Sequence, residues 1–145
     1  MVEQFNINGQ IVNVDVQKTK ALYEKLPLIS DKEHCGCPEC IYYTKVITQT
    51  SPAIQLFFKQ FGIDPRKEAE VWRACENDNG TYYYIADYHF IGEIQDVPEL
   101  DWINVEEASF GLTNRVGELP SPMIPETFTS PIIELIAKIN LRSGI

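Results

Sequence analysis

The sequence predicts a single α+β domain over residues 1–145, in which a mostly antiparallel sheet packs against two or three helices. Three observations lead to this fold class. The chain has 145 residues and is 44% hydrophobic, which suits one buried core. Asn-Gly pairs at positions 8–9 and 79–80 stand between apolar segments, as they do in β-hairpins. Pro38 and Pro52 have the sequence context of a first helical residue.

Two hairpins are expected to supply most of the sheet. Residues 5–16 alternate apolar and polar side chains on either side of Asn8-Gly9, which tolerates the positive φ angles of a tight turn. The arms of the second hairpin are 71–76 and 81–94, which are rich in aromatic and β-branched residues. We therefore expect the second arm to be the aromatic centre of the sheet.

The turn of the second hairpin predicts which side chains share a face. If Asn79-Gly80 forms a two-residue turn, Cys75 faces Tyr84 across the ladder. His89 then lies on the opposite face of its strand. The residues expected to share that opposite face are Ile85, Asp87 and Ile91.

Two short helices are expected in the first half of the chain. One spans 17–26 and stops at Pro27, because proline lacks the N–H that the next helical bond needs. The other begins at Cys37-Pro38 and runs to about Ile47, since proline's fixed φ suits the first helical position.

A third helix has the clearest pattern in the chain. Ser51 is its expected cap, Pro52 its first residue and Gly62 its stop. Apolar residues recur at i, i+3, i+4 and i+7, which predicts one buried stripe. The stripe consists of Ile54, Phe57, Phe58 and Phe61.

The last third of the chain is less regular. Residues 96–104 are expected to be a connection and residues 108–113 a short strand. Residues 132–141 fit both a helix and a strand, because their isoleucines and leucines match both periods. The isoleucine content and the preceding prolines favour a strand.

Charge and hydropathy argue against several partners. Twelve basic and 21 acidic side chains give a formal net charge of −9, which repels nucleic acid and anionic lipid at long range. No basic stretch followed by an apolar one opens the chain, and no apolar run is long enough for a membrane helix. The expected location is the cytoplasm.

Three motifs resemble those of a family of small bacterial proteins that has no established activity. They are the helix start Cys37-Pro-Glu-Cys40, the turn Gly62-Ile-Asp-Pro-Arg-Lys67 and the strand end His89-Phe-Ile-Gly92. The resemblance covers about residues 35–92 and, more loosely, the final strand. It implies an α+β single domain in the cytosol, and it supplies no catalytic residue, substrate or cofactor.

The cysteines could hold a structural zinc ion. The spacing of Cys37 and Cys40 lets two thiolates of one helical turn point at one metal, and Cys35 and Cys75 are the remaining cysteines for a four-ligand site. His34 and His89 are alternative ligands, although the expected register separates Cys75 from His89. A second closely spaced cysteine pair, which is typical of zinc ribbons, is missing.

A redox role is the second interpretation of the same motif. Amide donors at the start of a helix stabilise a thiolate, which would lower the pKa of Cys37 below about 8.5. Glu39 opposes this effect, and the strand order expected here differs from the βαβ order of thioredoxin-like folds. In the third interpretation, the cysteines are small apolar residues that pack the start of a helix.

Other candidate sites have ordinary structural explanations. Asp87 and His89 point to one face of a strand and could act in acid–base chemistry, but a histidine beside isoleucines is more often a core residue. Arg66-Lys67 beside Asp64 could bind an anion, or simply form local ion pairs. The tyrosines of the aromatic strand could contact a protein partner, but core packing is the commoner use of such residues.

The sequence therefore predicts a non-enzymatic binding or regulatory module with an unidentified protein partner. Its cysteine cluster would be structural or would hold zinc. The alternative is a thiol–disulfide redox enzyme or a metal-dependent enzyme that uses Cys37-Pro-Glu-Cys40.

Overall fold

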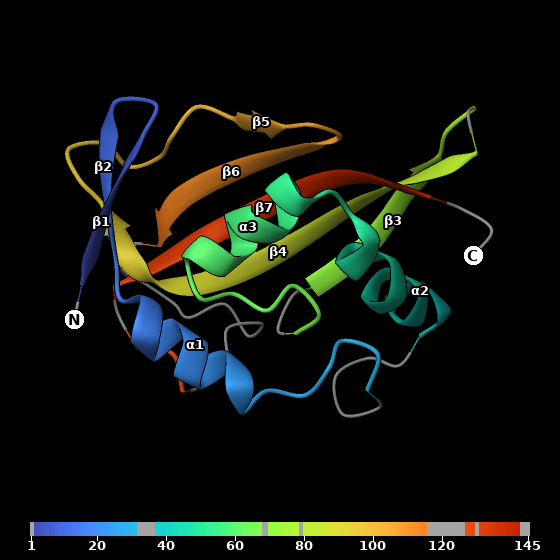
Figure 1. Ribbon diagram of the computed structural model, residues 1–145, viewed down its shortest axis with the longest axis horizontal. Helices are drawn as coiled ribbons and strands as arrows, with labels where there is room; N and C mark the ends of the chain where they lie inside the picture. Colours follow the sequence, from blue (N-terminus) through green and yellow to red (C-terminus); the bar gives the residue numbers. More distant parts are fainter. Residues whose placement is uncertain are drawn as a thin grey trace.

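The protein is an α+β domain in which three α-helices pack on a seven-stranded antiparallel sheet (Figure 1). The computed structural model describes residues 2–31, 37–67, 70–78, 80–115, 127–129 and 131–142. The strands are β1 (Glu3–Ile7), β2 (Gln10–Val14), β3 (Glu70–Glu76), β4 (Thr81–Ile94), β5 (Ile103–Val105), β6 (Ala108–Arg115) and β7 (Ile132–Arg142). The order in the sheet is β1-β2-β4-β7-β6-β5, and β3 also pairs with β4. The predicted fold class is confirmed.

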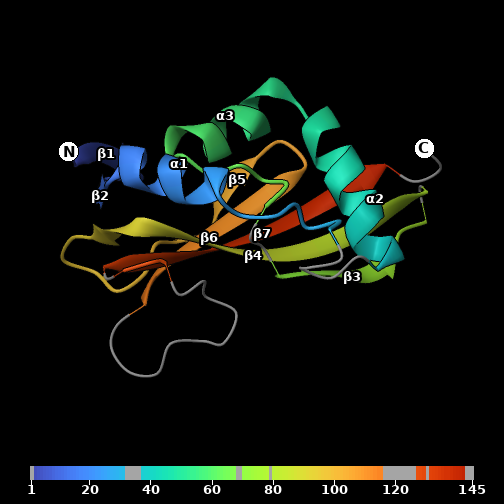
Figure 2. The same ribbon diagram turned by 90° about the horizontal axis from the view of Figure 1, so that it is seen from below.

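The helices lie on one face of the sheet (Figure 2). They are α1 (Val16–Glu24), α2 (Pro38–Val46) and α3 (Pro52–Gln60), with a 3₁₀ turn, η1 (Ile47–Gln49), between the last two. Alternate residues of β4 point toward the helices, and three of them, Tyr84, Tyr88 and Phe90, are fully buried. The aromatic strand is therefore the centre of the core, as its composition predicts.

The apolar stripe of α3 packs on aromatic side chains of the sheet. Its phenylalanines meet aromatic rings of β4 and β6, with ring centroids 4.1 to 5.0 Å apart. The contacting pairs are Phe57–Phe110, Phe58–Tyr88 and Phe61–Phe90. Ser51 caps the helix by accepting a hydrogen bond from the amide of Ile54. The predicted cap, first residue and buried stripe are confirmed.

The predicted register of the second hairpin is wrong, by one residue at Cys75 and by two residues at Arg73. Cys75 pairs with Tyr83, and Arg73 pairs with Tyr84, because a bulge lies between Arg73 and Cys75. The turn is also longer than expected, since the amide of Asn77 donates to the carbonyl of Thr81. Asn79 itself lies outside the described residues. The consequence is that Cys75 shares a face with Tyr83, whereas Arg73 points with Tyr84 toward the helices.

The C-terminal segment is a strand, which resolves the ambiguity in its sequence. β7 runs antiparallel between β4 and β6, and its residues Ile133, Leu135, Ala137 and Ile139 are fully buried. β5, a short strand paired with β6, lies in a region that the sequence predicts to be a connection. A strand of three residues is too short to show the alternation of apolar and polar side chains that predicts a strand.

Candidate functional site

Cys37 and Cys40 lie together at the start of α2. Cys37 has extended backbone angles and caps α2. Pro38 is the first residue of α2, as the sequence predicts. The amide of Cys40 donates a hydrogen bond to Cys37 Sγ over 3.4 Å. Such a donor stabilises negative charge on the sulfur. The helix start therefore directs one backbone amide donor at the sulfur of Cys37.

The two sulfur atoms are close but are not joined by a disulfide. Cys37 Sγ and Cys40 Sγ are 3.1 Å apart, and a disulfide bond is about 2.05 Å long. A movement of about 1 Å would therefore bring the two sulfur atoms to bonding distance. Cys40 is buried, whereas Cys37 is partly exposed. Cys37 is the thiol that a molecule in solution reaches first.

An open hollow of about 600 Å³ lies beside Cys37, between α2 and the β3–β4 ladder. It is lined by Cys37, Pro38, Glu39, Tyr42, Arg73 and Tyr82. The guanidinium of Arg73 stands 4.5 Å from the centre of the Tyr82 ring, a cation–π contact. The same guanidinium lies 3.8 Å from the carboxylate of Glu39. The carboxylate of Glu39, whose negative charge opposes a thiolate at Cys37, thus has the positive charge of Arg73 beside it.

Tyr42 lines this hollow, Tyr84 packs against Tyr42, and the hydroxyl oxygens of both tyrosines are buried. The ring of Tyr84 stacks on that of Tyr42 with centroids 6.1 Å apart. Among the described residues, neither hydroxyl has a hydrogen-bond partner. Burial raises the pKa of Tyr84 to about 12; Arg73 opposes this effect, and Glu39 adds to it. Burial is also the main reason that the pKa of Tyr42 is raised. Both tyrosines stay neutral at physiological pH.

The other metal-ligand candidates do not join this pair in the described part of the chain. Cys75 is exposed on β3 and contacts Asn77 Oδ1, 3.9 Å from its sulfur. Within the described ranges, no three histidine, cysteine or acidic side chains could hold a metal ion together. Cys35 and His34 lie outside those ranges, so the expected zinc site stays a prediction.

His89 is a buried sheet residue, as its isoleucine neighbours suggest. It is 3% exposed, and its Nε2 lies 3.9 Å from Glu134 Oε2 of the neighbouring strand β7. Its backbone carbonyl accepts a hydrogen bond from the hydroxyl of Tyr23. Asp87 is on the same face of β4, two residues away. A role in acid–base chemistry for this pair stays a prediction.

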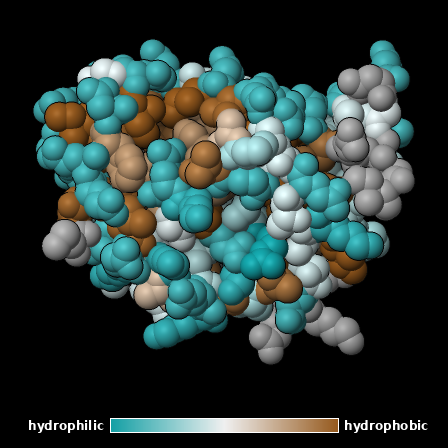
Figure 3. Space-filling view, in the orientation of Figure 1, coloured by the Kyte–Doolittle hydropathy of each residue, from teal (hydrophilic) through white to brown (hydrophobic). Residues whose placement is uncertain are grey.

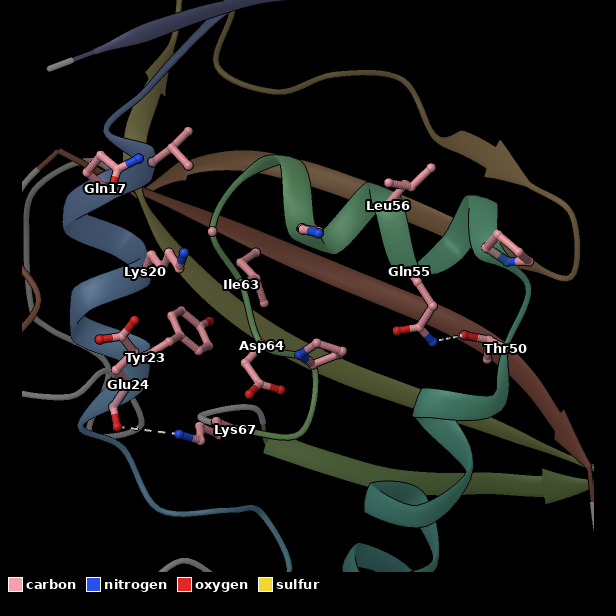
Figure 4. A pocket seen from close by; sticks show the side chains of 15 residues that line it. Gln17, Lys20, Tyr23, Glu24, Thr50, Gln55, Leu56, Ile63, Asp64 and Lys67 are labelled. Atoms are coloured by element: carbon pink, nitrogen blue, oxygen red, sulfur yellow. Dashed lines mark hydrogen bonds between the residues drawn. The ribbon is translucent and has the colours of Figure 1, made fainter.

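A larger groove of about 870 Å³ separates α1 from α3 (Figure 4). Lys20 of α1 and Lys67 of the segment that follows α3 both line it, and Lys67 Nζ donates to the carbonyl of Glu24. Asp64 also lines it and holds Arg66 through two hydrogen bonds, to Nε and to Nη2. Burial alone would raise the pKa of Asp64, but the hydrogen bonds and charge of Arg66 lower it. The local ion pair expected at this turn is present.

The helical face is hydrophilic over much of its area, with hydrophobic patches among polar side chains (Figure 3). Large hydrophobic residues that are exposed on the described surface include Leu56 in the groove and Ile41 on α2. Such single residues are normal on a protein surface. The groove contains charged and apolar groups, whereas the hollow beside α2 places a cysteine sulfur next to a cavity. The hollow is therefore the stronger candidate site.

Sequence reasoning missed Arg73, Tyr42 and Tyr82 as neighbours of Cys37. No motif links these residues, which come from α2, β3 and β4. The predicted two-residue turn places Arg73 on the same face as Tyr84, but opposite Ala86. The bulge in β3 and the longer turn pair Arg73 with Tyr84 instead, and they move Cys75 off the helical face.

No known family model, curated protein or solved structure matches this chain. The resemblance to the small bacterial family stays a prediction. In the described residues, no helix is long and apolar enough to cross a membrane.

Proposed function

We propose that the protein exchanges disulfides through Cys37 and Cys40, with Cys37 as the attacking thiol and Cys40 as the resolving thiol. The observation that carries this proposal is the 3.1 Å separation of the two sulfur atoms at the start of α2. The cap geometry supports it, because the amide of Cys40 donates to Cys37 Sγ. The hollow beside Cys37 supports it as well, since it gives a second molecule room to approach.

The proposed reaction has two steps. The thiolate of Cys37 attacks one sulfur of a disulfide R–S–S–R, so that a Cys37–S–R bond forms and one R–S⁻ leaves with the electron pair and takes up a proton. Cys40 then loses its proton and attacks Cys37 Sγ, which releases the second R–S⁻. The products are two R–SH molecules and a Cys37–Cys40 disulfide. The protein is oxidised by two electrons, and the substrate disulfide is reduced by two.

The exposure of the two cysteines assigns their order in this scheme. Cys37 is partly exposed and lines the hollow, so an external disulfide reaches it first. Cys40 is 2% exposed and lies within one helical turn of Cys37. A buried neighbour of this kind is suited to attack a mixed disulfide that has already formed on Cys37.

The test uses oxidised glutathione as the probe disulfide and mass spectrometry of alkylated peptides as the readout. The full chain is expected to form a Cys37–Cys40 disulfide and to release two equivalents of glutathione. Cys40→Ser is expected to stop at a mixed disulfide on Cys37, and Cys37→Ser is expected to lose the reaction. Cys75→Ser is the matched control, because Cys75 is exposed but lies outside the hollow.

Two results would overturn the proposal. One is a mixed disulfide that forms on Cys35 or Cys75 at an unchanged rate in Cys37→Ser. The other is protein, purified without chelator or histidine tag, that holds one zinc ion per chain and has thiols that react only after denaturation. The second result would instead support a structural metal site.

A further inference from the structure

We infer that the hollow beside Cys37 selects small disulfides that carry free α-amino acid groups, with cystine as the simplest example. This inference rests on the proposed disulfide exchange and names the substrate class for it. Its basis is a pair of opposite charges, Arg73 and Glu39, that line the same hollow as the attacking sulfur.

The two charges have the arrangement that a zwitterion needs. An α-amino acid carries a carboxylate and an ammonium a few ångströms apart, and the Arg73 nitrogen and Glu39 oxygen are 3.8 Å apart. The carboxylate of a ligand would pair with the guanidinium fork of Arg73, and its ammonium would pair with Glu39. A diamine or a dicarboxylate offers a partner to only one of the two residues.

Arg73 and Glu39 bind each other weakly enough to accept a ligand. Their separation exceeds the 2.7–3.2 Å of a normal hydrogen bond. Both side chains are also exposed, at 37% and 43%, and solvent screens such pairs strongly. A ligand that supplies hydrogen-bonding charges to each residue therefore gives up little of the original ion pair.

Both residues are nevertheless held in place by the fold. Arg73 is paired with Tyr84 in the β3–β4 ladder, and its guanidinium is seated over the Tyr82 ring. Glu39 is in the first turn of α2, two residues after Cys37. A volume of about 600 Å³ is in the usual range for small-molecule sites. Because Cys37 lines the same hollow, a disulfide bound there would lie in the cavity that contains the attacking sulfur.

The test compares three small disulfides: cystine, which is zwitterionic at each end, the diamine cystamine and the dicarboxylate dithiodiglycolate. The rate constant for oxidation of the Cys37–Cys40 pair is measured by stopped flow for each. Each rate constant is divided by that for dithiothreitol with the same disulfide, which removes differences in intrinsic reactivity. We expect the normalised rate for cystine to exceed the other two by about tenfold, which corresponds to about 1.4 kcal/mol.

Single-charge variants then assign the preference to each residue. Arg73→Gln is expected to reduce the cystine rate about tenfold toward the cystamine rate, and Arg73→Lys to reduce it less. Glu39→Gln is expected to reduce the cystine rate and raise the dithiodiglycolate rate. Lys45→Gln and Glu76→Gln are the matched controls, since both side chains are exposed and outside the hollow. Unfolding curves confirm that each variant is folded.

Failure of this inference is distinguishable from failure of the proposed function. If neither oxidised glutathione nor any of the three disulfides oxidises the Cys37–Cys40 pair, disulfide exchange itself is refuted. If oxidised glutathione reacts and none of the three does, exchange stands and the substrate class is wrong. If all three react at the same normalised rate, or if Arg73→Gln keeps the preference for cystine, exchange stands and the substrate class is wrong. A preference for cystamine or dithiodiglycolate also overturns the substrate class.

Discussion

The hydroxyl group of Tyr43 on α2 donates a hydrogen bond to the hydroxyl oxygen of Tyr88 on β4. The direction follows from Tyr88, whose single hydroxyl proton is donated to the carbonyl of Pro65 over 2.7 Å. Both tyrosines are fully buried. Burial raises the pKa of Tyr43, so its hydroxyl keeps the proton that it donates. The chain of bonds ties α2, the sheet and the loop before β3 together.

Tyr88→Phe is expected to destabilise the protein more than Tyr43→Phe. Removal of the Tyr88 hydroxyl leaves both the Tyr43 proton and the Pro65 carbonyl without this partner, at a cost of about 1–3 kcal/mol. Removal of the Tyr43 hydroxyl leaves the bond from Tyr88 to Pro65 intact and should cost about 0.5–1.5 kcal/mol. Urea unfolding monitored by circular dichroism measures both values. Equal or reversed losses would contradict the assigned direction of the bonds.

Tyr84→Phe is expected to have the opposite effect, because its buried hydroxyl lacks a partner among the described residues. The substitution should be neutral, or should stabilise the protein by up to about 1 kcal/mol, because no hydrogen bond is lost. The same urea titration measures this change. A loss as large as that of Tyr88→Phe would show that the Tyr84 hydroxyl does have a partner.

The pH dependence of Tyr84→Phe has a defined sign. The pKa of Tyr84 rises on folding from the ordinary 10.0 to about 12, because burial favours the neutral phenol. A group with a raised pKa contributes its full stability below the unfolded pKa and loses it as the pH rises through the folded pKa. The wild-type protein should therefore lose more stability between pH 10 and about 12 than Tyr84→Phe does. Identical alkaline profiles would contradict this expectation.

Gly62→Ala is expected to destabilise the protein more than Gly9→Ala, although both glycines have a φ of +84°. An alanine at either position is strained by about 1–2 kcal/mol. At Gly9, the added Cβ would meet no atom within 4 Å, but at Gly62 it would lie 2.6 Å from the carbonyl oxygen of Val16 on α1. Thermal unfolding of the two variants measures the difference. Equal losses would mean that α1 moves aside without cost.

The sequence predicted most of the fold because local signals and tertiary packing agreed. Ser51-Pro52 and the phenylalanine stripe of α3 specify the same helix and the same buried face that the structure shows. Asn8-Gly9 predicts the first hairpin, and in the structure both residues have the positive φ that its turn requires. In each case the residues that determine the element lie within one short segment.

The candidate site was only partly predictable, because one bulge determines which residues meet. Cys37 and Cys40 follow from a motif of four residues and a helix start. The predicted turn places Arg73 on the helical face opposite Ala86, but the bulge and the longer turn pair it with Tyr84 and move Cys75 by one residue to the other face. A slip of one residue moves side chains to the other face, and no single-sequence period reports it. The charge pair of the hollow was therefore visible only in the structure.

The two roles of Cys37, as helix cap and as attacking thiol, are separable by substitution. Serine is a better cap than cysteine, so Cys37→Ser should match or exceed the wild type in thermal stability under reducing conditions. Cys37→Ala removes the acceptor for the Cys40 amide and should cost about 0.5–2 kcal/mol. Both variants should lose disulfide exchange. Exchange needs the sulfur, so exchange that survives in Cys37→Ser would contradict the role of Cys37 as the attacking thiol. The cap needs only an acceptor, so equal stability of the serine and alanine variants would contradict its role as the helix cap.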